Sequence, residues 1–248
     1  MKRLILRADD LGFSEGINYG IEKTVREGLI RSVGLMPNMP AALHGVKLLE
    51  GLPVCLGQHT NICAGSPLTD PSLIPSITTK EGLFKSSKEY RSAREDFVVL
   101  EEVILEIEAQ YRRFKELTGR EPSYFEGHAV ASRNFFRGLQ IVAQRHGLKY
   151  LELNLTGPSR FGNSLLYTHM ESMLPDYDPM ESLKKMTFHE EEGKADCFIC
   201  HPGYLDAYIL RVSSLLAPRT LEVEMATSMD LKDFIKENQI QMITYDDL

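Results

Sequence analysis

The sequence predicts a single-domain α/β protein over residues 1–248, built as an irregular (β/α) barrel of about seven or eight strands, similar to a TIM barrel. Three observations predict this fold class. Short apolar segments alternate with amphipathic helical segments, as in parallel β-α units. No G-x-G-x-x-G pattern of an open dinucleotide-binding sheet follows the first apolar segment. No linker-like or low-complexity stretch divides the chain.

In the first half of the chain, short apolar segments bounded by turn residues are the expected strands. They lie at residues 4–6, 31–36, 54–59 and 123–128. The expected helices repeat apolar residues every three or four positions, and they lie at residues 14–28, 40–51 and 97–119. Ser14 is a suitable N-cap for the first helix, and Gly119 is a suitable end for the last.

The alternation is interrupted at residues 64–86, which are rich in Pro, Ser, Thr and Gly and predict an irregular loop. Long loops in compact domains are often functional, so we expect this one to be able to cover a bound substrate as a lid. The second half resumes the pattern less clearly, and residues 155–193 show no readable period. The expected helices there lie at 134–146, ended by Gly147, and at 231–238, and the expected strands lie at 149–153, 197–200 and 240–245.

The segment C-F-I-C-H-P-G at residues 197–203 contains C-x-x-C-H, the spacing of a covalent haem site. In a strand, however, alternation places Cys197 and Ile199 on one face and Phe198 and Cys200 on the other. The two thiols therefore point in opposite directions and cannot hold one ligand. We interpret the segment as a buried strand that ends by presenting His201.

Composition excludes several classes of function. The formal net charge of −7, without a basic run, argues against nucleic acid as a partner. No segment approaches the ~20 continuous apolar residues of a membrane span, and the first residues do not form a signal peptide. We therefore expect a soluble, cytoplasmic protein without a membrane partner, in which the four cysteines are free thiols.

Polar side chains follow the predicted strands where each strand ends. The pair Asp9 and Asp10 follows the first strand, and His59 ends the third. The fourth strand ends in Glu126 and His128, and His201 follows the strand at 197–200. In a (β/α) barrel the carboxyl ends of the strands converge on the catalytic face. One Asp and two His suit a metal site, which leaves a carboxylate and an imidazole for proton transfer.

Each of these residues alone also has a structural interpretation, since an Asp pair commonly forms a turn and a lone His commonly packs in a satisfied environment. Their shared position at strand ends favours the functional interpretation. The remaining histidines lie in helices or polar segments and are interpreted as structural: His44, His146, His169 and His189.

Several motifs resemble those of one family. The segments RADDLGFSEGINYGI, LGQHTNICAGSPL and FICHPG resemble the motifs of the YdjC-like carbohydrate deacetylases, which include chitooligosaccharide deacetylases. The segments APRTLEVE and IQMITYDDL also fit that family's C-terminal pattern. The resemblance spans nearly the whole chain in the expected order. It implies an irregular (β/α) barrel that removes acetyl groups from N-acetylated sugars with the aid of a divalent metal.

Carried over by motif, the resemblance implies that Asp10, His59 and His128 hold the metal. It further implies that Asp9 is the general base and that His201 stabilises or protonates the leaving group. The family is usually described with Mg²⁺, whereas an Asp/His/His site is chemically better suited to Zn²⁺ or another first-row metal. A homodimer is expected from the family and from the frequency of two-fold assembly.

The sequence departs from the family pattern in two places. The family's D-S-H-x-H motif here reads E-G-H-A-V at residues 126–130, so the acidic residue is longer and the second His is absent. The following segment, YLELNLTG, lacks the family's Arg, for which Arg160 is a candidate replacement. Two other functions therefore stay open: a different metal-dependent amide or ester hydrolase, and a non-catalytic sugar-binding protein. Phe13 and Tyr204 are candidates to stack on a sugar ring, with rim packing as the alternative.

Overall fold

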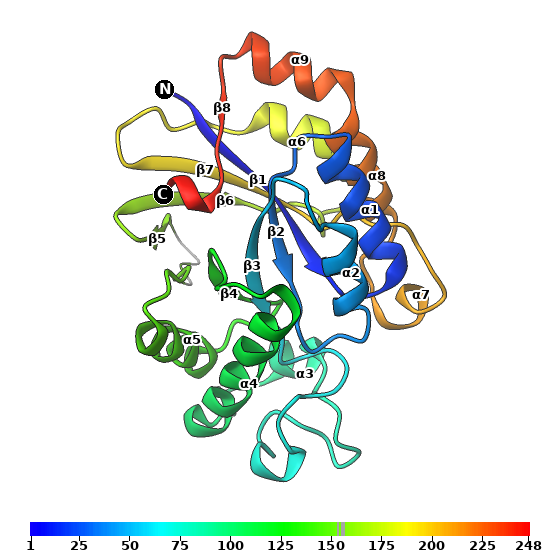
Figure 1. The fold of residues 1–248 in the computed structure, drawn as a ribbon, viewed down its shortest axis with the longest axis vertical. Coiled ribbons are helices and arrows are strands. Elements are labelled where there is room, and N and C mark those ends of the chain that lie inside the picture. Colours follow the sequence, from blue (N-terminus) through cyan, green and yellow to red (C-terminus); the bar gives the residue numbers. More distant parts are fainter. Residues whose placement is uncertain (153, 155–156) are drawn as a thin grey trace.

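The computed structural model describes residues 1–152, 154 and 157–248 (Figure 1). Within these residues, seven strands follow one another in the order β4-β3-β2-β1-β7-β6-β5, and an eighth, β8, pairs with β1. Neighbouring strands are parallel except for β5 and β6. The strands are β1 (Arg3–Leu11), β2 (Ser32–Leu35), β3 (Cys55–Thr60), β4 (Phe125–Gly127), β5 (Ser159–Phe161), β6 (Ser164–His169), β7 (Lys194–Cys200) and β8 (Gln241–Met242). The predicted irregular barrel is confirmed.

Most of the helices cover the outer face of this curled sheet (Figure 1). The helices of the described residues are α1 (Glu15–Arg26), α2 (Ala42–Leu48), α3 (Ser87–Ser92), α4 (Leu100–Thr118), α5 (Arg133–His146), α6 (Pro179–Lys185), α7 (Ile209–Val212), α8 (Ala217–Thr227) and α9 (Met229–Glu237). The predicted ends are confirmed: the side chain of Ser14 caps α1, and Gly119 and Gly147 end α4 and α5 in the left-handed conformation. Within the described part of the chain, every helix falls short of the length or apolar character that spanning a bilayer requires.

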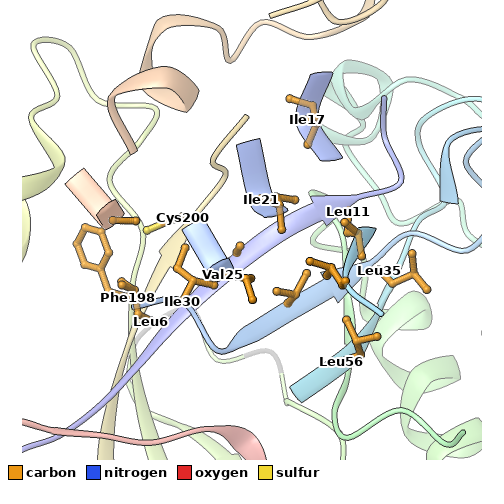
Figure 2. Close-up of a cluster of buried hydrophobic side chains, with 14 of the residues drawn as sticks. Leu6, Leu11, Ile17, Ile21, Val25, Ile30, Leu35, Leu56, Phe198 and Cys200 are labelled. Carbon is orange, nitrogen blue, oxygen red and sulfur yellow. The ribbon is translucent and has the colours of Figure 1, made fainter. Parts of the chain in front are cut away.

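The two faces of the sheet bury different side chains. Leu6 of β1 and Phe198 and Cys200 of β7 face outward and pack against the helix layer, as Figure 2 shows. Ile5 and Cys197 belong to a separate cluster inside the barrel. This confirms the predicted alternation along residues 197–200, and it leaves the thiols of that strand on opposite sides of the sheet.

Several predicted strand boundaries are wrong, including the start of β7, which lies at Lys194 rather than at residue 197. The first strand extends to Leu11 rather than ending at residue 6, so Asp9 and Asp10 lie within it. The strand expected at 149–153 is reduced to an isolated bridge between Tyr150 and Phe125, because β4 is only three residues long; residue 153 lies outside the described residues. The strand expected at 240–245 ends at Met242. It pairs with Arg3 and Leu4 of β1, and from Arg7 onward β1 pairs with β2 instead.

Residues 155–193, which show no hydrophobic periodicity typical of a helix or a strand, nevertheless contain regular elements. Within the described part of this stretch, β5 and β6 form a two-residue hairpin in which Phe161 pairs with Ser164. Gly162 adopts a positive φ of 57° at the turn. The Gly-Asn pair at 162–163 is a hairpin signal that could have identified these strands.

The irregular segment at 64–86 is confirmed apart from a short 3₁₀ turn at Pro71–Leu73. It is anchored on α4, because the backbone N–H groups of Leu68 and Thr69 donate to the buried carboxylate of Glu106. Its apolar side chains pack against α4 and α5 in one buried cluster. The role of this segment as a lid stays a prediction.

A buried carboxylate stabilises the outer face of β7. Asp196 is fully buried and accepts hydrogen bonds from the backbone N–H of His189 and from its ring Nδ1, both at 2.8 Å. His169 Nε2 lies 3.6 Å from the same carboxylate. Burial by itself would raise the pKa of Asp196, but the bonds from His169 and His189 outweigh it and lower the pKa.

The Asp196→Asn variant is expected to lower the free energy of unfolding by about 1–3 kcal/mol at neutral pH, because an amide cannot accept all of these bonds. A carboxyl with a lowered folded-state pKa stabilises the fold above its unfolded pKa of ~3.9, and that contribution is lost as the pH falls through the folded-state value. Urea unfolding of both proteins should therefore show a difference at pH 7 that shrinks at about pH 3. A difference that stays constant would contradict this assignment.

Candidate active site

A bulge in β1 brings two consecutive carboxylates to the same place. Between Ala8 and Leu11 the pairing of β1 with β2 shifts by one residue, and Asp10 adopts a positive φ of 76°. In a regular strand, consecutive side chains point to opposite faces. The extra residue re-aims one of them, so that both Asp9 and Asp10 line a single cavity.

Asp10 meets two imidazoles inside this cavity. Asp10 Oδ1 lies 3.4 Å from His59 Nε2 on β3 and 3.2 Å from His128 Nδ1, directly after β4. The two ring nitrogens are 2.9 Å apart, and the three potential ligand atoms lie within 4.8 Å of one another. Among the described residues Asp10 Oδ1 makes no hydrogen bond of regular geometry, although it is buried. Three donor atoms thus surround one point, as a metal site requires.

The electrostatics of the three residues also fit a cation. Burial opposes the charged form of each, but Arg219 and His128 lower the pKa of Asp10 well below its usual value. Glu126 and Asp9 raise the pKa of His59 well above its usual value, and Asp10 raises that of His128 to about 9, both against burial. The same acidic groups would favour a bound cation, which competes with protons for the ring nitrogens of the two imidazoles.

Two buried arginines hold the two carboxylates. Arg219 of α8 donates to Asp10 Oδ2 at 2.7 Å, and Arg7 of β1 donates to Asp9 Oδ2 at 2.6 Å. Because of Arg7, Asp9 keeps a lowered pKa despite its burial. Neither arginine was identified as functional from the sequence. The signal for Arg7 is its place in the strand alternation, on the same face as Ile5 and Asp9.

Glu126 orients His59 rather than binding a second ion. Its carboxylate contacts His59 Nδ1, which directs Nε2 toward Asp10. Asp9, His59 and Glu126 also form a geometrically possible metal group. However, Arg7 Nη2 lies 3.6 Å from Glu126 Oε2 as well as 2.6 Å from Asp9 Oδ2, so these carboxylates already share a cation. The first group is therefore the better candidate metal site.

His201 is held through its backbone at the end of β7. Its N–H donates to the carboxylate of Glu222 at 2.6 Å, and its carbonyl accepts from Arg219 at 3.2 Å. Burial raises the pKa of Glu222 to about 7. The ring of His201 lines the cavity, with Nδ1 3.3 Å from the hydroxyl of Ser172. Burial lowers the pKa of His201 to about 4, so its imidazole is neutral at neutral pH.

Gly34 of β2 leaves the space that the site needs. A Cβ at this position would lie 3.0 Å from Asp9 Oδ1 and 3.1 Å from the Cβ of His59. The base candidate and a candidate ligand therefore approach each other across a strand that contributes no side chain there.

The cavity has a volume of about 520 Å³, within the range of small-molecule sites. Its walls are largely apolar and include Phe13, Val130, Phe136, Leu151 and Met170. Phe13 contacts His128 edge to face and can be reached from the cavity, but Tyr204 does not line it. Arg160 is exposed on β5 and does not line it either, so the candidate replacement for the missing Arg is wrong. Arg7 and Arg219 provide the guanidinium groups instead.

The structure brings together all six residues expected from the strand ends, Asp9, Asp10, His59, Glu126, His128 and His201, around this one cavity. It places the other histidines elsewhere. Asn18 contacts His44, and Glu108 contacts His146 at the surface. His169 and His189 pair with Asp196, on the outer face of β7.

Two named relatives match almost the whole chain. The chain is 31% identical to a protein named carbohydrate deacetylase 2 from Listeria innocua, over 99% of this chain and 98% of that protein. It is 30% identical to a protein named chitooligosaccharide deacetylase from Escherichia fergusonii, over 99% and 98%.

Two solved structures share the fold. A protein from Enterococcus faecalis, described as a putative cellobiose-phosphate cleavage protein, matches with a TM-score of 0.83 at 22% identity, over 99% of this chain and 98% of that one. A family 4 acetyl xylan esterase from Clostridium thermocellum, in complex with a cobalt ion, matches with a TM-score of 0.52 at 9% identity, over 99% and 89%. The family model described as YdjC-like protein matches residues 3–237, and the chain belongs to this family.

Proposed function

We propose that this chain is a metal-dependent deacetylase that hydrolyses the acetamido group of an N-acetylated sugar or oligosaccharide. The observation that carries the proposal is the convergence of Asp10, His59 and His128 beside Asp9 and His201 in one cavity. The names of the relatives from Listeria innocua and Escherichia fergusonii support the choice of substrate class. A cytoplasmic location and a homodimer stay predictions from the sequence.

Asp10, His59 and His128 would hold the ion. When bound, a divalent ion there would polarise the acetyl carbonyl and lower the pKa of a water molecule. One carboxylate and two imidazoles suit Zn²⁺, Co²⁺ or Mn²⁺ better than Mg²⁺, which prefers oxygen ligands. We therefore favour a first-row metal over the Mg²⁺ that the family resemblance implies.

The remaining residues would move the proton. Asp9, kept ionised by Arg7, accepts a proton from the attacking water as the new C–O bond forms. The C–N bond of the amide then breaks, and the departing nitrogen takes up a proton to leave as an amine. The other product is acetic acid, which loses its proton to the amine or to water and becomes acetate. Because burial keeps His201 neutral, this residue does not start as an imidazolium. It hydrogen-bonds the substrate, accepts the proton from Asp9 and donates it to the departing nitrogen, which returns Asp9 to the ionised form and His201 to the neutral form.

A substrate panel tests this proposal. The protein is stripped of metal, reloaded separately with Zn²⁺, Co²⁺, Mn²⁺ or Mg²⁺, and assayed on N-acetylated mono- and oligosaccharides and on generic esters. Release of acetate together with a free amine from the sugars is the expected result. Turnover of esters alone would indicate a different hydrolase, and sugar binding without turnover would indicate a non-catalytic protein.

A further inference from the structure

One side chain near the end of the chain enters the interior of the barrel. Tyr245, which follows β8, is fully buried there. Its ring stacks on that of Tyr124, with centroids 4.0 Å apart, and meets Phe161 edge to face. These residues share one inward-facing cluster with Ile5 and Cys197. A residue that sequence places at the far end of the chain thus lies beneath the carboxyl ends of the strands.

A single side chain joins Tyr245 to the candidate base. Arg7 donates from Nη1 to the hydroxyl of Tyr245 at 3.0 Å and from Nη2 to Asp9 Oδ2 at 2.6 Å. Arginine only donates, so the Tyr245 oxygen is the acceptor. Its own hydrogen is free to point elsewhere, and Cys197 Sγ lies 3.7 Å away.

The guanidinium has few other hydrogen bonds to fix its orientation, although its Cζ also lies 5.8 Å from the centroid of the Tyr124 ring. Arg7 Nε has no hydrogen-bond partner among the described residues, and Glu126 Oε2 lies 3.6 Å from Nη2. Among the described residues, the hydroxyl of Tyr245 is therefore the neutral group that accepts a hydrogen bond from Arg7, beside the carboxylates of Asp9 and Glu126 that attract its charge.

We infer that Tyr245 is a positioning residue, which acts through Arg7 to set the orientation of Asp9 at the reacting atoms. This inference rests on the proposed function, since it takes Asp9 to be the base. Side chains that fix a catalytic group affect the rate steeply, because displacements of about 1 Å can cost up to ~10²-fold.

The chain offers a closely matched control. Tyr124 and Tyr245 stack on each other, yet the hydroxyl of Tyr124 is buried without a hydrogen-bond partner among the described residues. Tyr245→Phe and Tyr124→Phe thus remove the same atom from two adjacent rings, and only the first removes a contact with Arg7.

Steady-state kinetics of the metal-loaded protein test the inference. Tyr245→Phe is expected to lower kcat about tenfold at unchanged KM and metal content. Tyr124→Phe is expected to keep kcat within about twofold of the wild type. Equal losses in both variants would show a packing effect and would overturn the inference. A wild-type kcat in Tyr245→Phe would also overturn the inference. The proposed function is tested separately, because loss of turnover in Asp9→Asn would support it whatever Tyr245→Phe shows.

A double-mutant cycle with Arg7→Lys tests the connection itself. Lysine keeps the buried charge but cannot bridge two partners as a guanidinium does, so this variant is expected to lose kcat by a similar factor. Adding Tyr245→Phe to it should then cost little more. If Tyr245→Phe lowers kcat by the same factor in both backgrounds, Tyr245 does not act through Arg7. Should Tyr245→Phe fail to fold, a wild-type kcat in Arg7→Lys would still overturn the inference.

Discussion

The His128→Ala variant is expected to lose both deacetylation and the bound metal ion. His128 Nδ1 lies 3.2 Å from Asp10 Oδ1 and 2.9 Å from His59 Nε2, so its removal leaves two ligands where three converge. A site with two protein ligands binds a divalent ion weakly, and the Lewis acid is lost with it. Metal content after dialysis and turnover of the best substrate of the panel measure the two effects. Both should fall to the background of the assay.

His146→Ala is the control for this variant. His146 ends α5 and contacts Glu108 at the surface, away from the cavity. Its replacement should leave metal content and turnover at wild-type values. A His128→Ala protein that retained one ion and normal turnover would show that Asp10, His59 and His128 do not form the metal site.

The Asp9→Asn variant is expected to keep its metal ion and to lose about 10²–10⁴-fold in kcat. An amide has the shape of the carboxylate and still accepts a hydrogen bond from Arg7, but it cannot take a proton from water at neutral pH. The metal ligands are untouched by this change. Kinetics combined with metal analysis of the same sample distinguishes the two properties.

The adjacent residue serves as the comparison. Asp10→Asn replaces a candidate ligand, so it should lose metal content together with activity, whereas Asp9→Asn should lose activity alone. One measurement would then distinguish the role of Asp9 as base from the role of Asp10 as metal ligand. Full activity of Asp9→Asn on its substrate would refute the assignment of the base.

The alternation of strands and helices along the chain was predictable because it depends on local sequence patterns. Ser14, Gly119 and Gly147 mark helix ends through backbone conformation alone, and the structure confirms all three. The strand expected at 149–153 failed for a different reason. The length of a strand depends on how many residues of the neighbouring strand can pair with it, and β4 is too short to pair with five residues.

The candidate site shows the same limit. The six residues at strand ends were predictable because parallel strands bring their carboxyl ends together. Arg219 was not, since α8 contacts Asp10 across 209 residues of sequence. The bulge at Asp10 was also not predictable, because it follows from a register shift against β2 rather than from any pattern within β1.

The position of β1 in the sheet has a consequence for biosynthesis. The ribosome releases β1 first, yet Leu4 pairs with Asp196 of β7, which emerges only after most of the chain has been translated. During that interval one side of the central strand has no partner, and an unpaired apolar strand is prone to associate with other chains. We expect nascent chains halted before residue 194 to depend on a chaperone more than chains that extend past residue 200, because only the longer chains can pair β7 with β1.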